Sequence, residues 1–206
     1  MGPIFTLYGV LALLTGYLLG SLPFGLMLTR AAGLGDVRRI GSGNIGATNV
    51  LRTGHKGLAA ATLLLDLIKG TIAVLVVYEV AKRFVAFEAY RLAYIAGFGA
   101  FLGHLFPVWL RFVGGKGIAT FIGVLIGVHW PAALVFAVVW AAVAAGSRYS
   151  SLAALSGTAA VLIYYLLLGQ AGLPFILAMA ALILVKHEAN IRRLWQGTEA
   201  RIGARS

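Results

Sequence analysis

The chain has 206 residues, of which 61% are hydrophobic and only 11% are charged, and its formal net charge is +11. Soluble domains are about 45–50% apolar and about 25% charged, so this composition excludes an ordinary soluble domain and indicates an integral membrane protein. The absence of cysteine also excludes disulfides, thiolate metal ligands and a cysteine acyl-enzyme. No linker or low-complexity segment marks a second domain, so we expect a single domain over residues 1–206.

Seven apolar stretches follow one another, at 4–28, 58–80, 90–110, 117–128, 131–146, 151–168 and 172–186. The first is longer than a signal-peptide core and lacks a cleavage site, so we expect a retained span. A continuous helix over 118–146 would measure about 43 Å against a hydrocarbon core of about 30 Å. Because Pro starts helices well and Trp favours the interface, we predict a break at His129-Trp130-Pro131. The expected fold is an all-α bundle of seven transmembrane helices.

The basic residues predict the orientation of these spans. With seven spans, 13 of the 17 basic residues fall on one side: Arg30, Arg38, Arg39, Arg52, Lys56, Arg111, Lys116, Arg148, Lys186, Arg192, Arg193, Arg201 and Arg205. Three fall on the other side (Lys82, Arg83 and Arg91), and Lys69 lies within a span. By the positive-inside rule, the N-terminus is outside and the C-terminus is cytoplasmic.

The net charge of +11 suggests anionic partners, either nucleic acid or phosphate and lipid headgroups. The basic residues are divided among short loops without interleaved aromatics, so we expect no nucleic acid partner. Arg38, Arg39, Arg201 and Arg205 flank spans, and we interpret them mainly as membrane anchors.

The first polar motif runs from Ile40 to Arg52 and is rich in Gly, small hydroxyls and carboxamides. Glycines let consecutive N–H groups converge on an anion, hydroxyl and amide side chains add hydrogen bonds, and Arg52 adds charge. This composition predicts a phosphate cradle, with a solvated turn as the alternative. The pattern of a nucleotide P-loop is absent.

The second motif joins Gly103-His104-Leu105-Phe106-Pro107 to Gly114-Gly115-Lys116-Gly117, just before an apolar helix. N–H groups at a helix start and the Lys116 ammonium favour one anion, so we predict a second phosphate site here. His104 is a candidate general base, and a histidine hydrogen-bonded inside the bundle is the alternative.

Two further polar segments lie on the same side. Ser151 follows a tight turn and is interpreted as the N-cap of the sixth helix. In the segment 186–199, a helix would place His187 and Asn190 on one face, and Glu199 is expected to orient a basic partner. Within the second span, Asp66 and Lys69 are three residues apart, and we expect them to pair with each other or with an Arg of the first loop.

Several catalytic patterns are absent from the sequence. No histidine is followed five residues later by aspartate, metal-ligand spacing is missing, and no G-x-S-x-G occurs. Charge stabilisation, positioning and one histidine remain as the available chemistry, and we expect neither cofactor nor metal.

The motifs resemble those of the bacterial membrane acyl-phosphate:glycerol-3-phosphate acyltransferases. The resemblance rests on Gly41-Ser-Gly-Asn-Ile-Gly-Ala-Thr-Asn49, Gly103-His-Leu-Phe-Pro107 with Gly114-Gly-Lys-Gly-Ile-Ala-Thr120, His187-Glu-Ala-Asn-Ile-Arg-Arg-Leu-Trp-Gln-Gly-Thr-Glu199, and Tyr17-Leu-Leu-Gly-Ser-Leu-Pro-Phe-Gly25. It covers the whole chain, and three long motifs in order are highly specific. Family members often carry His-Arg-x-Asn, whereas this chain has Glu188 after His187, so His and Asn are kept without the basic residue.

The resemblance implies acyl transfer from a fatty acyl phosphate to the 1-hydroxyl of glycerol 3-phosphate, in the cytoplasmic (inner) membrane. The residues that it implies for the acyl phosphate are Ser42, Gly43, Asn44, Gly46, Ala47, Thr48 and Asn49. For glycerol 3-phosphate it implies Arg52, Lys116, Ser151, His187 and Asn190, the last four also as catalytic residues. His104, Gly114, Gly115 and Gly117 are further candidates.

On this hypothesis the hydroxyl attacks the mixed anhydride directly, and either His187 or the phosphate of the donor is the base. An anion transporter is the rival from another class, although transporters favour inverted repeats and a site at the midplane. A lipid phosphatase is the enzymatic rival, and it would release phosphate without an acceptor.

Overall fold

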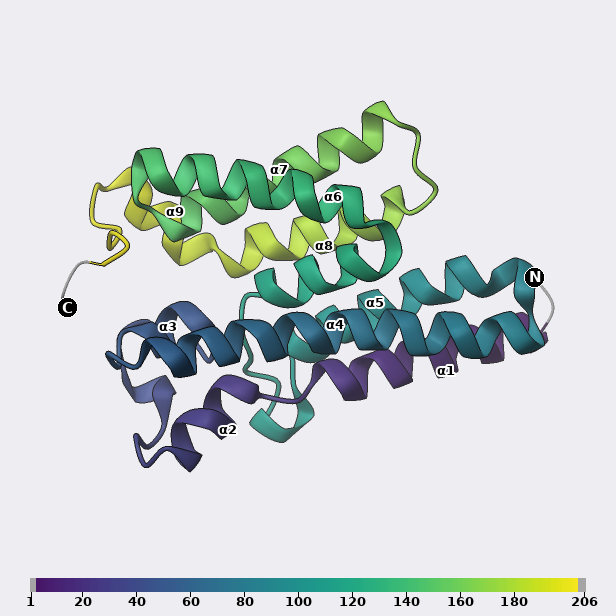
Figure 1. Cartoon of the computed structure of the whole chain (residues 1–206), viewed down its shortest axis with the longest axis horizontal. Helices are drawn as coiled ribbons and strands as arrows, with labels where there is room; N and C mark the ends of the chain where they lie inside the picture. The colour runs from purple at the N-terminus through teal and green to yellow at the C-terminus, as the bar shows by residue number, and fades with distance from the viewer. Residues whose placement is uncertain (1–2, 204–206) are drawn as a thin grey trace. The chain divides into compact units, whose positions relative to one another are not determined.

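A computed structural model describes residues 3–203, so the predicted anchor Arg205 lies outside the described residues. The described chain is helical, as predicted, with short 3₁₀ turns between helices (Figure 1). The helices are α1 (Pro3–Gly20), α2 (Phe24–Ala31), α3 (Ala47–Leu51), α4 (Lys56–Phe84), α5 (Ala89–Leu105), α6 (Ile118–Ser147), α7 (Ser150–Leu167), α8 (Leu173–Lys186) and α9 (Glu188–Trp195). The 3₁₀ turns are η1 (Val37–Arg39), η2 (Ala86–Glu88) and η3 (Val108–Leu110).

Among the described residues, five helical segments are long and apolar enough to cross a membrane: Thr6–Ala31, Lys56–Phe84, Ala86–Leu110, Ile118–Ser147 and Ser150–Leu167. A sixth is formed if α8 and α9, which meet at 58°, are one broken span. Each predicted apolar stretch overlaps a helix, but two of them share α6. A multi-span helical membrane protein is therefore supported.

Two of these segments are interrupted. His129 has the non-helical angles φ −162° and ψ 79° inside α6, which confirms the predicted break. Pro131 explains it, because its ring removes one helical hydrogen bond and clashes with the preceding turn. The first stretch, expected to be continuous, is also broken: α1 ends at Gly20, and α2 begins after Pro23.

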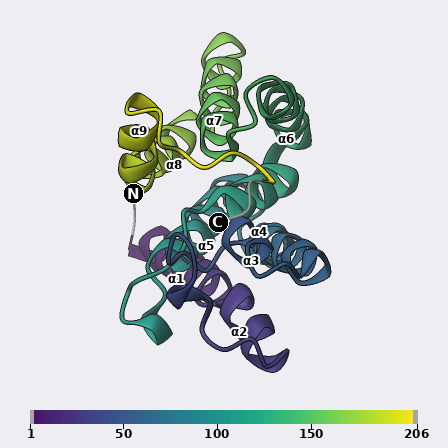
Figure 2. The same ribbon diagram turned by 90° about the vertical axis from the view of Figure 1, so that its left-hand side faces the viewer.

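The chain divides into two compact units, residues 1–128 and residues 129–206, each described here by itself. In the first unit, α1, α4 and α5 lie side by side (Figures 1 and 2). Small residues let α1 and α5 approach closely: a Cβ atom at Gly20 would lie 1.9 Å from the carbonyl oxygen of Ala100. The first half of α6 packs on α4, where Thr71 Oγ1 donates a 2.8 Å hydrogen bond to the Gly123 carbonyl.

The second unit contains the rest of α6 together with α7, α8 and α9. Its core includes the buried side chains of Phe136, Val161, Tyr165, Met179 and Ile183. The segment after α9 returns to the turn before α7, where the Ile202 N–H donates to the Arg148 carbonyl at 2.7 Å. The described residues that follow the last helix are therefore held beside the start of α7.

Candidate active site

The first motif is a loop fixed by an apolar cluster in the first unit. Val37, Ile45 and Val50 are at most 3% exposed and pack with Leu26 of α2 and Ala59 of α4. The polar residues between these anchors are partly or fully exposed, apart from the buried Asn49. The loop therefore presents its polar groups from a buried apolar base.

Asn49, a residue that is 2% exposed, organises this loop through its side chain. Its amide nitrogen donates to the carbonyls of Val37 and Asn44 at 2.9 and 2.8 Å, and its oxygen accepts from the N–H of Ser42 at 3.0 Å and from the Ser42 hydroxyl at 3.3 Å. The Gly46 N–H donates to the side-chain oxygen of Asn44 at 2.9 Å. Several groups expected to face a phosphate are thus used to shape the loop itself.

Asp36 stabilises the start of the same loop. Its carboxylate accepts hydrogen bonds from the Arg38 backbone N–H at 3.0 Å and from the Arg38 guanidinium at 2.6 Å, and Arg30 adds a contact at 3.2 Å. The side-chain hydrogen bond from Arg38 holds the pKa of Asp36 well below its usual range. Arg38, interpreted as an anchor, is therefore engaged within the loop.

Arg52 ends α3 and is exposed, with its side chain lying against Gly41. A Cβ atom at Gly41 would lie 2.7 Å from the Arg52 guanidinium and from the Asn49 oxygen. The Arg52 side chain therefore lies along the first motif, where its charge is available to an anion in solution.

The second motif closes on itself at the end of α5. The Gly115 N–H donates to the His104 carbonyl at 3.0 Å, and the Gly114 N–H donates to the Leu105 carbonyl at 3.2 Å. These two N–H groups were expected to face an anion, but the loop uses both of them. The second phosphate site at Lys116 stays a prediction. Lys116, half-buried, follows directly and precedes α6.

The loop between the two halves of the motif is fastened to α1. Trp109 Nε1 donates to the Ser21 hydroxyl at 2.8 Å, and the Tyr17 hydroxyl donates to the Phe106 carbonyl at 2.7 Å. Leu110 in the same loop packs against the apolar cluster under the first motif. The first unit therefore brings the first two motifs together.

In the second unit, Glu199 is the centre of a polar cluster. Its Oε1 accepts from the Ser151 hydroxyl and from the Asn190 amide, each at 2.6 Å, and its Oε2 accepts from Arg193 at 2.7 Å. Burial raises the pKa of Glu199, but the three hydrogen bonds outweigh it and hold the pKa below its usual value. Glu199 therefore orients a basic partner, as expected, and also two predicted site residues.

The side chain of Ser151 does not cap α7. The residue before the helix is Tyr149, without a side-chain capping bond, and the Ser151 hydroxyl points to Glu199 instead. The N-cap interpretation was therefore wrong. A charge-assisted hydrogen bond is stronger than a neutral one, which explains why the hydroxyl takes the carboxylate.

His187 lies at the bend between α8 and α9, not inside one helix as the spacing suggested. The residue is 3% exposed, and Nδ1 lies 2.8 Å from the Ile183 carbonyl. Since a carbonyl only accepts, Nδ1 carries the proton in the neutral ring and Nε2 carries the lone pair. Three positions on, Asn190 is also buried, so both predicted residues lie in the interior of this unit.

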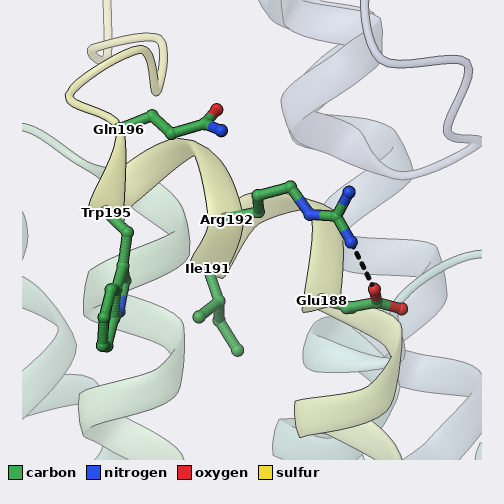
Figure 3. A pocket seen from close by; sticks show the side chains of 5 residues that line it. All are labelled: Glu188, Ile191, Arg192, Trp195 and Gln196. Atoms are coloured by element: carbon green, nitrogen blue, oxygen red, sulfur yellow. Dashed lines mark hydrogen bonds and ion pairs between the residues drawn. The ribbon is translucent and has the colours of Figure 1, made fainter.

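The opposite face of α9 is open. Glu188, Ile191, Arg192, Trp195 and Gln196 line a pocket there (Figure 3). Glu188, the residue after His187, pairs with Arg192 at 3.0 Å while remaining largely exposed. The Glu188 carboxylate therefore faces away from the buried Asn190.

The predicted acceptor residues are divided between the units. Arg52 and Lys116 belong to the first, and Ser151, His187 and Asn190 to the second. The sequence did not identify Trp109 as the residue that fastens its loop to Ser21, or Arg193 as the basic partner of Glu199. The polar tip of an aromatic side chain that needs a partner was the available signal for Trp109.

Known proteins resemble the chain along most of its length. The sequence pattern of the family described as Glycerol-3-phosphate acyltransferase matches residues 10–197, which include the first two polar motifs and the third as far as Gly197. The chain belongs to this glycerol-3-phosphate acyltransferase family. Relatives called glycerol-3-phosphate acyltransferase include one from Mesorhizobium japonicum, 62% identical over 96% of the chain and 98% of that protein, and one from Brucella anthropi, 59% identical over 94% and 93%.

Solved structures of the glycerol-3-phosphate acyltransferase family share the fold. PlsY (YgiH), an integral membrane glycerol 3-phosphate acyltransferase in its glycerol 3-phosphate form, is 34% identical with a TM-score of 0.85, over 95% of this chain and 96% of that one. Its lysophosphatidic acid form gives a TM-score of 0.83 at the same identity, over 95% of both chains. The resemblance in the motifs is therefore matched by the backbone.

Proposed function

We propose that this glycerol-3-phosphate acyltransferase takes its acyl group from a fatty acyl phosphate and places it on the 1-hydroxyl of glycerol 3-phosphate. The products are 1-acylglycerol 3-phosphate and inorganic phosphate, in the first acylation of phospholipid synthesis. The observation that carries the proposal is the family match over residues 10–197, with every predicted site residue inside it. The forms solved for PlsY, with glycerol 3-phosphate and with lysophosphatidic acid, support the acceptor and the product.

The donor is proposed to bind at the first motif, through Ser42, Gly43, Asn44, Gly46, Ala47, Thr48 and Asn49. Asn49 acts there mainly by holding the loop, because its side chain is engaged with Val37, Asn44 and Ser42. Glycerol 3-phosphate is proposed to bind through Arg52, Lys116, Ser151, His187 and Asn190. A donor and an acceptor that both carry phosphate account for the excess of basic groups.

The reaction proposed is a direct displacement. The 1-hydroxyl oxygen forms a bond to the carbonyl carbon of the mixed anhydride, and the carbon–oxygen bond to phosphate breaks after a tetrahedral intermediate. The hydroxyl proton passes either to His187 Nε2, which carries the lone pair, or to the phosphate of the donor. Because the anhydride is already activated, no acyl-enzyme is needed, and positioning with charge stabilisation supplies most of the acceleration.

We also propose seven membrane crossings, counting the two halves of α6 separately, in the inner membrane. The N-terminus is outside, and the polar motifs and C-terminus are cytoplasmic. The chain has no cysteine, so single cysteines report topology without background. We expect Arg201→Cys to react with an impermeant thiol reagent only from the cytoplasmic side, and Phe87→Cys only from the outside; the reverse pattern would overturn the orientation.

The donor is tested by comparing substrates. The purified protein in detergent is given labelled glycerol 3-phosphate with palmitoyl phosphate, palmitoyl-CoA or palmitoyl acyl carrier protein in separate reactions. We expect labelled lysophosphatidate only with palmitoyl phosphate. Equal activity with palmitoyl-CoA would overturn the donor assignment, and flux of glycerol 3-phosphate into proteoliposomes without acylation would favour the transporter.

A further inference from the structure

A buried ionic group in the first unit has no role in the proposed chemistry. Asp66 and Lys69 of α4 and His104 of α5 each have side chains about 3% exposed. The Asp66 Oδ1 lies 2.7 Å from Lys69 Nζ and 3.6 Å from His104 Nδ1. Burying such groups is costly, so an ionic group inside a span calls for a functional explanation.

The group lies on α4 and α5 and is tied to two further segments of the unit. Lys69 Nζ also donates to the Leu22 carbonyl at 2.8 Å, at the break between α1 and α2. The Thr120 hydroxyl of α6 donates to the Asp66 backbone carbonyl at 3.0 Å. The carboxylate beside His104 is therefore fixed by α4 itself, by the first broken span and by α6.

His104 connects this group to the glycine loop of the second motif. The Nδ1 edge of the ring faces Asp66, and the other edge lies against Gly115. A Cβ atom at Gly115 would stand 2.1 Å from Nε2, 2.9 Å from Cε1 and 3.0 Å from Cδ2. The imidazole thus fills the space beside Gly115, and only a residue without a side chain fits there.

The main chain of His104 holds the same glycine. The His104 carbonyl accepts from the Gly115 N–H at 3.0 Å, so ring and carbonyl of one residue both fix the position of Gly115. Lys116 is the next residue. A shift of the imidazole would therefore be passed to the backbone that carries the Lys116 ammonium.

We propose that His104 is a positioning residue for the loop Gly114–Gly117 and that Asp66 aligns its ring. Through this loop His104 holds Lys116 in place to bind the phosphate of glycerol 3-phosphate. This rests on the proposed function, in which Lys116 binds that phosphate. One ring edge faces a carboxylate and the other faces the loop, so His104 acts through Lys116 and not as the general base. Displacement by about 1 Å can cost about 100-fold in an enzyme, which sets the scale of the effect.

The test is a double-mutant cycle read out by steady-state kinetics. Gly115→Ala pushes a methyl group into the ring, and His104→Ala removes the ring; we expect each to raise the KM for glycerol 3-phosphate about 10- to 100-fold. The KM for palmitoyl phosphate should change less than threefold. In the double variant the methyl group occupies the space that the ring has left. The fold-increase in the KM for glycerol 3-phosphate should therefore be well below the product of the two single fold-increases.

His129→Ala is the matched control, because His129 contacts Tyr164 in the other unit and has no part in the proposed site. It should leave both KM values unchanged. If His104→Ala does not fold, His104→Asn is measured with the same expectations. Two results would overturn the positioning role: equal increases in the KM values for both substrates, or a KM increase in the double variant equal to the product of the two single increases.

The wild type and Lys116→Ala separate the two proposals. Suppose that the wild type transfers the acyl group and that Lys116→Ala weakens the binding of glycerol 3-phosphate. A wild-type KM for glycerol 3-phosphate in the His104 variants would then overturn the positioning role of His104 and leave the proposed function standing. If the wild type transfers no acyl group, the proposed function fails and the inference fails with it.

Discussion

The Ser151 hydroxyl donates a 2.6 Å hydrogen bond to the Glu199 carboxylate, 48 positions further along the chain. The same carboxylate oxygen accepts from Asn190, and the other accepts from Arg193. Two residues proposed to bind glycerol 3-phosphate are therefore aligned by one carboxylate that is not itself proposed to touch the substrate.

Glu199→Ala should destabilise the protein, because it removes the acceptor of three hydrogen bonds. Hydrogen bonds to charged groups contribute about 1.5–3 kcal/mol, and Arg193 is partly solvated, so we expect a loss of about 2–3 kcal/mol. Thermal unfolding in detergent should show a Tm lower by about 5–10 °C. Glu188→Ala is the control: its side chain is 75% exposed, and removal should cost less than about 1 kcal/mol. Similar Tm values for both variants would contradict the role of Glu199.

Stability should depend on pH through Glu199 and Asp36. Hydrogen bonding lowers both pKa values in the folded protein, for Glu199 despite burial. The unfolded chain then binds more protons, so this stabilisation is present above the usual carboxyl values of 4.5 and 3.8 and is lost as the pH falls below them. We expect the Tm to fall below about pH 4.5, and to fall less steeply in Glu199→Gln. An unchanged slope in that variant would rule out the contribution of Glu199.

Asn49→Asp should weaken the first motif although the two side chains have the same shape. The amide nitrogen that donates to the Val37 and Asn44 carbonyls becomes an oxygen, so one buried and one partly buried hydrogen bond lose their donor. We expect a loss of about 2 kcal/mol or more and a raised KM for palmitoyl phosphate. Asn44→Asp keeps the oxygen that accepts from Gly46, so it should retain the wild-type Tm. Equal Tm values for the two variants would show that Asn49 does not hold the loop.

Lys116→Ala should raise the KM for glycerol 3-phosphate about 10- to 100-fold, or abolish turnover, with an unchanged Tm. The reason is the loss of a charge-assisted contact to phosphate, worth about 1.5–3 kcal/mol. Lys82→Ala removes an exposed lysine that pairs with Glu79 and should leave the kinetics unchanged. Wild-type kinetics in Lys116→Ala would remove Lys116 from the site.

His187→Ala decides which group takes the hydroxyl proton. If His187 Nε2 is the base, kcat should fall about 10²- to 10⁴-fold at saturating substrates, since general base catalysis contributes on that scale. The hydrogen bond from Nδ1 to Ile183 fixes the ring for this role, so a large fall is the expected result. A kcat within tenfold of the wild type would assign the proton to the phosphate of the donor.

Local patterns predicted much of the fold. The helices follow from apolar stretches, the break at His129 follows from Pro131, and Asp66 pairs with Lys69 because residues three apart share a helix face. The interruption between α1 and α2 was not predicted, because hydropathy does not reveal a change of helix direction within an apolar stretch.

Contacts between distant residues were beyond the sequence. Spacing says nothing about the bonds between Ser151 and Glu199 or between Ser21 and Trp109, which lie 48 and 88 positions apart. The glycine loop shows the same limit, since its N–H groups bind carbonyls of α5 that composition does not identify. Residue types were informative about the chemistry, and only the fold shows which groups remain available for it.

The most direct test is the stoichiometry of the reaction, followed in one vessel with palmitoyl phosphate, with and without glycerol 3-phosphate. We expect one lysophosphatidate and one inorganic phosphate for each palmitoyl phosphate consumed, and no phosphate release when the acceptor is omitted. Phosphate released at the same rate without glycerol 3-phosphate, or lysophosphatidate formed without consumption of palmitoyl phosphate, would contradict it.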